Sequence, residues 1–171
     1  MTIYTIGHST HPIEKFVEML AANEVSLIAD VRTIPRSRRN PQYGAEELAA
    51  GLKASGIAYK RLAGLGGLRH AKKDSVNTAW EKDTFRGFAD YMQTEEFAVS
   101  LAELIETAKA QPTAILCAEA LPWRCHRSLI ADALTVRGVW VLHIMSKTSV
   151  KEHALTSFAV VEGEKITYPK K

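Results

Sequence analysis

Short apolar runs alternate with segments of helical periodicity along most of this chain. The runs typical of strands are residues 2–6, 25–31, 57–61, 113–118 and 139–144. This alternation favours a mostly parallel sheet, because parallel strands are joined by crossovers that pack helices on the sheet. We therefore predict a single α/β domain over residues 1–171, with three layers, about five strands in the sheet and helices on both of its faces.

The segments between these strands carry helix and loop signals. Helices are predicted at residues 12–20, 46–55, 83–92, 94–108 and 128–134. Thr94 is a typical N-cap, and Gly56 is suited to end the second helix. Residues 62–80 are rich in glycine and lysine without a clear period, which predicts a long loop. Residues 158–161 and 165–168 flank a Glu-Gly-Glu turn, which predicts a C-terminal β-hairpin.

The composition is that of an ordinary globular protein, with 46% hydrophobic and 24% charged residues. The formal net charge of +3 is only weak support for a polyanionic partner. No apolar run reaches the ~18 residues of a membrane span, and the first residues lack the basic region of a signal peptide. Two cysteines cannot form the disulfide framework of a small secreted domain. We expect a cytoplasmic protein with no membrane partner.

Both cysteines lie within residues 116–127, together with a glutamate, a histidine and two arginines. This segment falls between a predicted strand and a predicted helix, where free backbone N–H groups favour anions. A thiol near a helix N-terminus and beside basic side chains is expected to have a pKa well below the ~8.5 of a free cysteine. The candidates for nucleophilic or acid–base roles are Cys125, His126, Glu119 and Cys117, with His8 from an earlier strand end.

Two other interpretations of this segment stay open. A zinc ion could be held by both cysteines with His126, His8 or Glu119, but zinc sites favour two or four residues between cysteines, and these have seven. We therefore expect no metal and no other cofactor. Alternatively, the cysteines are buried as small hydrophobic residues, and Glu119 pairs with an arginine.

Polar residues also follow the other predicted strands. Because ligands bind beyond the carboxyl ends of parallel strands, we expect these clusters, and His143, to meet at one edge of the sheet. Arg32, Arg38 and Arg127 are expected to clamp an anion, since a guanidinium binds phosphate or carboxylate through two hydrogen bonds. The glycine-rich loop is a candidate flap that brings Arg69 over the site. The predicted substrate-binding residues are Gly7, Ser9, Asp30, Arg32, Ser37, Arg38, Gly67, Arg69 and Arg127. The structural alternatives are a hydrogen-bonded His8 and a solvated loop containing Arg36 and Arg39.

The order of these motifs is similar to that of the domain of unknown function 488 family. The residues that carry the resemblance are Thr5-Ile6-Gly7-His8-Ser9, Asp30-Val31-Arg32, Pro35, Ser37, Arg38, Tyr59, Leu65-Gly66-Gly67, Arg69, Cys117-Ala118-Glu119, Pro122, Cys125-His126-Arg127 and His143. The resemblance implies a small cytoplasmic α/β protein and assigns no activity.

A second resemblance is to rhodanese-like and cysteine-phosphatase domains. In those domains a strand with Asp-Val-Arg precedes a strand that ends in a catalytic cysteine, followed by a phosphate-binding loop and an arginine that opens a helix. Cys117 and Arg127 have the corresponding positions here, but nine residues lie between them, whereas a phosphatase loop has five. Sulfur or phosphoryl transfer through Cys117 is the activity that this resemblance implies.

The sequence therefore predicts an enzyme that binds a small anionic substrate, phosphorylated or nucleotide-like, at the strand ends. The alternative is a nucleic-acid-binding module in which a basic surface follows a phosphate backbone. Its candidate residues are Arg36, Arg38, Arg39, Lys72 and Lys73. A regulatory domain with an inactive pocket is the third interpretation.

Overall fold

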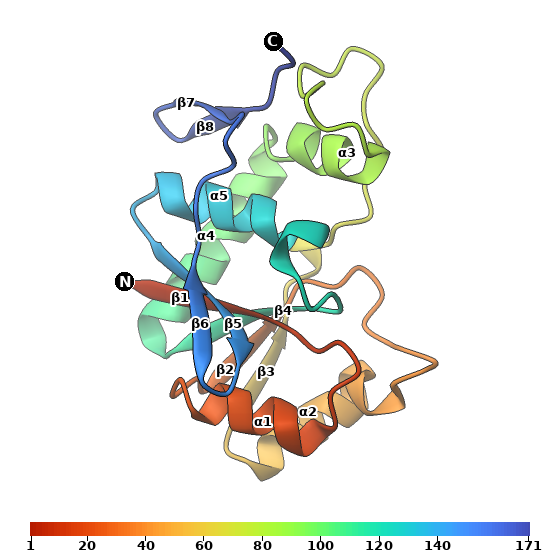
Figure 1. Ribbon diagram of the computed structural model, residues 1–171, viewed down its shortest axis with the longest axis vertical. Helices are drawn as coiled ribbons and strands as arrows, with labels where there is room; N and C mark the ends of the chain where they lie inside the picture. The colour runs from red at the N-terminus through yellow and green to blue at the C-terminus, as the bar shows by residue number, and fades with distance from the viewer.

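Five parallel strands and one antiparallel edge strand form the central sheet in the computed structural model, which describes residues 1–171 (Figure 1). The strand order is β3-β2-β4-β1-β5-β6. In chain order, the elements are β1 (Thr2–Gly7), α1 (Ile13–Ala21), β2 (Leu27–Asp30), η1 (Pro41–Tyr43), α2 (Ala45–Ala54), β3 (Ala58–Arg61), η2 (Ala63–Leu65), α3 (Asp83–Tyr91), α4 (Glu95–Ala110), β4 (Thr113–Cys117), η3 (Pro122–Arg124), α5 (Arg127–Val136), β5 (Trp140–Ser146), β6 (Ser149–Glu152), β7 (Val160–Glu162) and β8 (Lys165–Thr167).

Each face of the sheet is covered by helices, as the α/β pattern predicts. The helices α1 and α2 bury Phe16 and Leu48 in one apolar cluster with Ile28 of β2. On the other face, α3, α4 and α5 contribute to a larger cluster that includes Ile115 of β4. Burial of one such large aliphatic or aromatic side chain stabilises the fold by roughly 1.5–3 kcal/mol. The two clusters confirm the predicted three-layer α/β architecture.

Strand β4 lies inside the sheet, between β2 and β1, although it is fourth in sequence. Its five residues are all buried, and it ends at Cys117. The chain segments after β1 and β2 therefore pass on either side of this cysteine. This arrangement brings residues more than 80 positions apart in the sequence to one edge of the sheet.

Several element boundaries differ from the sequence prediction for local reasons. Strand β2 begins at Leu27 rather than at residue 25, because the Val25 N–H bonds to the Leu20 carbonyl after α1 and pairing with β3 and β4 starts only at Leu27. Pro12 precedes α1 as its N-cap instead of occupying the first helical turn. Strand β6 was not predicted, because all four of its residues are exposed and show no apolar alternation.

The C-terminal hairpin, β7 and β8, forms a separate two-stranded sheet, as predicted. Tyr168, just beyond it, is fully buried and donates a hydrogen bond to Asp132 of α5 at 2.8 Å. This contact joins the end of the chain to the helix that follows Cys125. None of the helices combines the length and the apolar character that crossing a bilayer requires.

Candidate active site

The carboxyl ends of β1, β2 and β4 meet at one edge of the sheet. Gly7 pairs with Cys117, and Asp30 pairs with Leu116. The backbone pairing continues beyond the strands, since the His8 N–H donates to the Cys117 carbonyl at 3.0 Å. The predicted convergence of the first three polar clusters is therefore seen in the structure.

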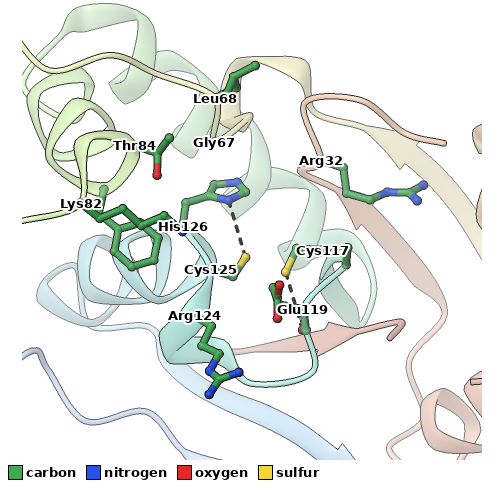
Figure 2. Close-up of a pocket in the computed structure, with 12 residues that line it drawn as sticks. Arg32, Gly67, Leu68, Lys82, Thr84, Cys117, Glu119, Arg124, Cys125 and His126 are labelled. Carbon is green, nitrogen blue, oxygen red and sulfur yellow. Dashed lines mark hydrogen bonds between the residues drawn. The ribbon is translucent and has the colours of Figure 1, made fainter. Parts of the chain in front are cut away.

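A cavity of about 260 Å³ opens at this edge (Figure 2). Its walls come from the β4–α5 connection, the segment after β2, the glycine-rich loop and the start of α3. The lining residues are Arg32, Gly67, Leu68, Lys82, Thr84, Phe85, Cys117, Ala118, Glu119, Arg124, Cys125 and His126. Both cysteines thus border a single space.

Arg127 lies behind this cavity and is fully buried. Its Nη1 group is 3.6 Å from the Cys117 sulfur, and its Nη2 group donates to the Ala120 carbonyl at 3.0 Å. It forms no ion pair with a carboxylate, and its Nε group has no hydrogen-bond partner. A buried cation is costly unless an anion lies beside it. Cys117 is the group in contact with Arg127 that can supply this negative charge.

The two cysteines have opposite pKa shifts. Burial alone would raise the pKa of Cys117, but the adjacent Cys125 thiol and the Arg127 cation outweigh it and hold this pKa below the ordinary value. The pKa of Cys125 is well above the ordinary value, because the neighbouring Cys117 and burial both favour its neutral thiol. The lowered pKa expected for one of the two cysteines therefore belongs to Cys117.

His126 is a neutral, hydrogen-bonded ring at the start of α5. Burial lowers its pKa to about 4. Its Nε2 atom is 3.0 Å from the Val31 carbonyl and 2.9 Å from the Leu65 carbonyl, so this nitrogen carries the hydrogen. Nδ1 is then left as an acceptor, 3.6 Å from the Cys125 sulfur. His126 orients Cys125 and joins β2 to the loop after β3.

Gly67 has a direct steric reason to be glycine. A Cβ atom there would collide with the His126 ring. The absence of a side chain lets the glycine-rich loop lie against the imidazole and form one wall of the cavity. The close packing of Gly67 against His126 is therefore enough to explain why a glycine lies at this position.

Arg32 is held in an ion pair with Asp30 and is only 6% exposed. Its Nε and Nη2 groups bond to the two carboxylate oxygens of Asp30 at 2.9 and 2.8 Å, and its Nη1 group donates to the Tyr43 carbonyl at 2.7 Å. Figure 2 shows its guanidinium directed away from both sulfur atoms. Arg32 therefore braces the end of β2, and its bidentate face is occupied by Asp30 instead of being free for an anion.

His8 is also buried and hydrogen-bonded. Its ring stacks on Tyr43 with 4.2 Å between centroids, and its Nδ1 atom donates to the Ser9 carbonyl at 2.8 Å. Burial lowers the pKa of His8, so the ring is neutral near pH 7. Its Nε2 atom faces Arg32 at 3.5 Å.

A second cavity, of about 470 Å³, adjoins the first and shares Ala118, Glu119 and Arg124 with it. It is lined by His8, Ser9, Thr10, Ser37, Arg38, Arg39, Asn40, Ala118, Glu119, Ala120, Leu121 and Arg124. In contrast to Arg32 and Arg127, its three arginines are exposed and have no side-chain partner within the chain. Their guanidinium groups are free to bind an anion.

Five residues predicted for the site line neither cavity, namely Gly7, Asp30, Arg69, Arg127 and His143. Arg69 donates to the Gly66 carbonyl at 3.2 Å, and its guanidinium lies 3.5 Å from the centre of the Tyr91 ring. His143 lies within β5 rather than at its end, with its Nε2 atom 2.9 Å from His153. His153 in turn bonds to buried Asp132 at 2.8 Å. This network connects β5 to α5, away from the cysteines.

The sequence prediction omitted residues that the fold brings to the first cavity. Lys82, Thr84 and Phe85 enter from the start of α3, and no motif marks them in the sequence. Arg124, one of the two arginines within residues 116–127, has no separate role in the sequence prediction, yet it borders both cavities. A basic residue directly before a candidate cysteine was the one available signal.

The large pKa shifts of His126 and His143 predict a loss of stability in mild acid. Burial lowers the pKa of His126 to about 4 and that of His143 to about 3. The unfolded chain takes up these protons as the pH falls below about 6.5, whereas the folded protein does so only near the lower values. Each histidine should therefore reduce the free energy of unfolding by about 1.4 kcal/mol per pH unit between pH 6 and 4.5. Urea denaturation across this range measures the slope.

The control for this prediction is His70→Gln, since His70 is an exposed residue on the surface. That variant should keep the slope of the parent protein. His143→Gln should lower the slope by about 1.4 kcal/mol per pH unit, because one fewer proton is taken up on unfolding. A free energy of unfolding that stays constant between pH 6 and 4.5 would contradict the assignment of both buried rings as neutral.

Most residues of the site lie within the part of the chain that matches a known protein family. A family model described as Domain of unknown function DUF488 matches residues 12–134, a stretch that contains Asp30, both cysteines and Arg127. No curated protein and no solved structure matches the chain. The match confirms the resemblance inferred from the motifs. Because it covers well over half of the 171 residues, this protein is a member of the DUF488 family.

Proposed function

We propose that the protein is an enzyme in which the Cys117 thiolate reacts with an anionic substrate, phosphorylated or nucleotide-like. The observation that carries this proposal is the fully buried Arg127, whose Nη1 group is 3.6 Å from the Cys117 sulfur and which has no carboxylate partner. Desolvation makes an isolated guanidinium unfavourable, so its positive charge favours a negative charge on the sulfur. A thiolate is the reactive form of cysteine.

The two adjoining cavities suit two parts of one substrate. The cavity of about 260 Å³ borders Cys117 and would receive the reacting group. The cavity of about 470 Å³ has three arginines without internal partners and would bind the charged part through paired hydrogen bonds. In this proposal Arg38, Arg39 and Arg124 take the anion-binding role that the sequence assigned to Arg32, Arg38 and Arg127.

The proposed reaction begins with attack by the Cys117 sulfur on an electrophilic atom of the substrate. A bond forms to sulfur, and the leaving group departs with the electron pair of the bond that breaks. Glu119 borders both cavities, and we assign its carboxylate the role of base toward the water that then releases the group from sulfur. Cys125 remains a neutral thiol next to the nucleophile.

Alkylation of Cys117 in a Cys125→Ser variant tests this proposal, because the serine hydroxyl keeps a donor beside Cys117 and leaves one thiol to label. The rate of reaction with iodoacetamide should reach half of its maximum at a pH well below ~8.5, which is the pKa of a free cysteine thiol. Phosphate or sulfate should slow the reaction by filling the basic cavity. The rate is measured by intact mass between pH 5 and 9.

Two arginine variants sharpen the result. Arg124→Ala should weaken protection by phosphate, whereas Arg36→Ala should leave it unchanged, since Arg36 is exposed but borders neither cavity. A Cys117 that titrates as an ordinary thiol and is indifferent to anions would overturn the proposed function.

A further inference from the structure

The two cysteines contact the same arginine, Arg127. The Arg127 side chain contacts the Cys117 sulfur at 3.6 Å, and the backbone N–H of the same residue donates to the Cys125 sulfur at 3.4 Å. The two sulfur atoms are thus held by two groups of one residue, and the thiol of Cys125 also contributes to the lowered pKa of Cys117. Both residues border the first cavity, and Figure 2 shows both sulfur atoms there. A reagent that reaches one sulfur therefore meets the other next to it.

We propose that Cys117 and Cys125 are a redox-active dithiol that reduces an anionic organic disulfide. This inference rests on the proposed Cys117 thiolate and gives it a further class of substrate, for which Cys125 instead of water releases the group bound to sulfur. Cys117 is the attacking cysteine, and Cys125 is the resolving cysteine. The carboxylates of the disulfide bind the free arginines of the second cavity.

The reaction is a pair of thiol–disulfide exchanges. The Cys117 thiolate attacks one sulfur of the substrate, a mixed disulfide forms, and the other half leaves as a thiolate. The Cys125 sulfur then attacks Cys117, the Cys117–Cys125 bond forms, and the second half leaves with the proton of the Cys125 thiol. In total the protein loses two electrons and the proton of Cys125, because the proton of Cys117 was already lost on ionisation. The substrate gains the two electrons and leaves as one thiolate and one thiol.

The backbone around Cys125 is compatible with this movement. Cys125 lies between η3 and α5, in an extended conformation with φ −141° and ψ 151°. Its backbone N–H donates to the Pro122 carbonyl and its carbonyl accepts from Ser128, so the sulfur moves toward Cys117 by rotation of the side chain, which leaves these hydrogen bonds intact. The Nδ1 atom of His126 lies 3.6 Å from the Cys125 sulfur and accepts a hydrogen bond from its thiol while the pair is reduced.

The buried charge of Arg127 also affects the disulfide. Oxidation removes the thiolate that Arg127 contacts and leaves the buried guanidinium without an anion. This cost favours the dithiol and weakens its driving force as a reductant, so an excess of the disulfide substrate is needed to drive the exchange, and the oxidised pair is readily reduced again. This is the behaviour of a catalytic pair and differs from that of a structural crosslink.

Reaction of the full-length protein with glutathione disulfide tests the dithiol. The chain has only two cysteines, so an intramolecular disulfide can join only these residues. The wild-type protein should lose two hydrogen atoms in mass and retain no glutathione. The Cys125→Ser variant should retain one glutathione on Cys117, because its resolving sulfur is absent. The Cys117→Ser variant should react at least about tenfold more slowly, since Cys125 holds its proton.

Circular dichroism of each variant establishes that it is folded, and the wild-type mass alone tests disulfide formation. A wild-type protein that accumulates the glutathione adduct, or that does not react, would overturn the dithiol. If Cys117 is still alkylated at low pH and protected by phosphate in that case, the proposed function stands and only the redox role fails. If Cys117 behaves as an ordinary thiol, both fail.

Discussion

Arg127→Met is expected to slow the alkylation of Cys117 at pH 7 by about 100-fold, because a nearby cation lowers a pKa by roughly 1–3. The variant removes the guanidinium that lies 3.6 Å from the sulfur and leaves the burial that disfavours a thiolate. Methionine fills much of the volume of arginine without burying a charge, so the variant should fold. The pH dependence of iodoacetamide labelling, read by intact mass in the Cys125→Ser background, measures the effect.

The matched control is Arg137→Met, which removes a guanidinium from the other end of α5. Arg137 pairs with Glu164 on the surface, far along the helix from the cysteines. It should leave the alkylation profile unchanged. Equal profiles for Arg127→Met and the parent would mean that the buried guanidinium does not sustain the reactivity of Cys117.

Gly7→Ala is expected to destabilise the protein by about 3 kcal/mol, at the upper end of the usual cost of overpacking a core. A Cβ atom at Gly7 would collide with the Glu119 backbone carbonyl and lie 2.8 Å from Nη1 of Arg127. The loop after β4 cannot retreat freely, since the Ser9 N–H holds the Ala118 carbonyl at 2.9 Å. Urea denaturation measures the change in the free energy of unfolding.

Gly51→Ala provides the matched control. Gly51 lies within α2, and an added Cβ would meet Ile13 at an ordinary contact distance of 3.6 Å. Alanine should stabilise this helix by up to about 1 kcal/mol. If both alanine variants had the same stability, the close approach of the β4 loop to β1 would not be a constraint on the fold.

The periodicity of the sequence was sufficient to predict the architecture. The alternating strand and helix patterns predict parallel strands, and the carboxyl ends of parallel strands lie at one edge of a sheet. Together these two points predict that Gly7, Asp30 and Cys117 lie close together. These patterns depend on which residues are buried in each element, and burial is encoded locally. Strand β6 was missed because its four exposed residues owe their conformation to pairing with β5.

The roles of individual side chains could not be predicted in the same way. Arg32, Arg38 and Arg127 are the same residue type, but their surroundings differ. Arg32 is buried in an ion pair with Asp30, whereas Arg127 is buried against the sulfur of Cys117. Which cysteine has the lowered pKa depends on which sulfur faces the guanidinium, and no spacing in the sequence expresses that. Lys82 and Phe85 enter the cavity from a helix that follows a long irregular loop, so their position is a property of tertiary packing.

Because β4 lies inside the sheet, the position of the Cys117 sulfur and the shape of the cavity depend on different parts of the chain. The sulfur of Cys117 is fixed by a strand that has neighbours on both sides. Much of the cavity wall instead comes from the irregular segments after β2 and before α3. Insertions or substitutions in those two segments would reshape what the pocket accepts while the nucleophile stays in register, so a new ligand preference could arise without rebuilding the sheet.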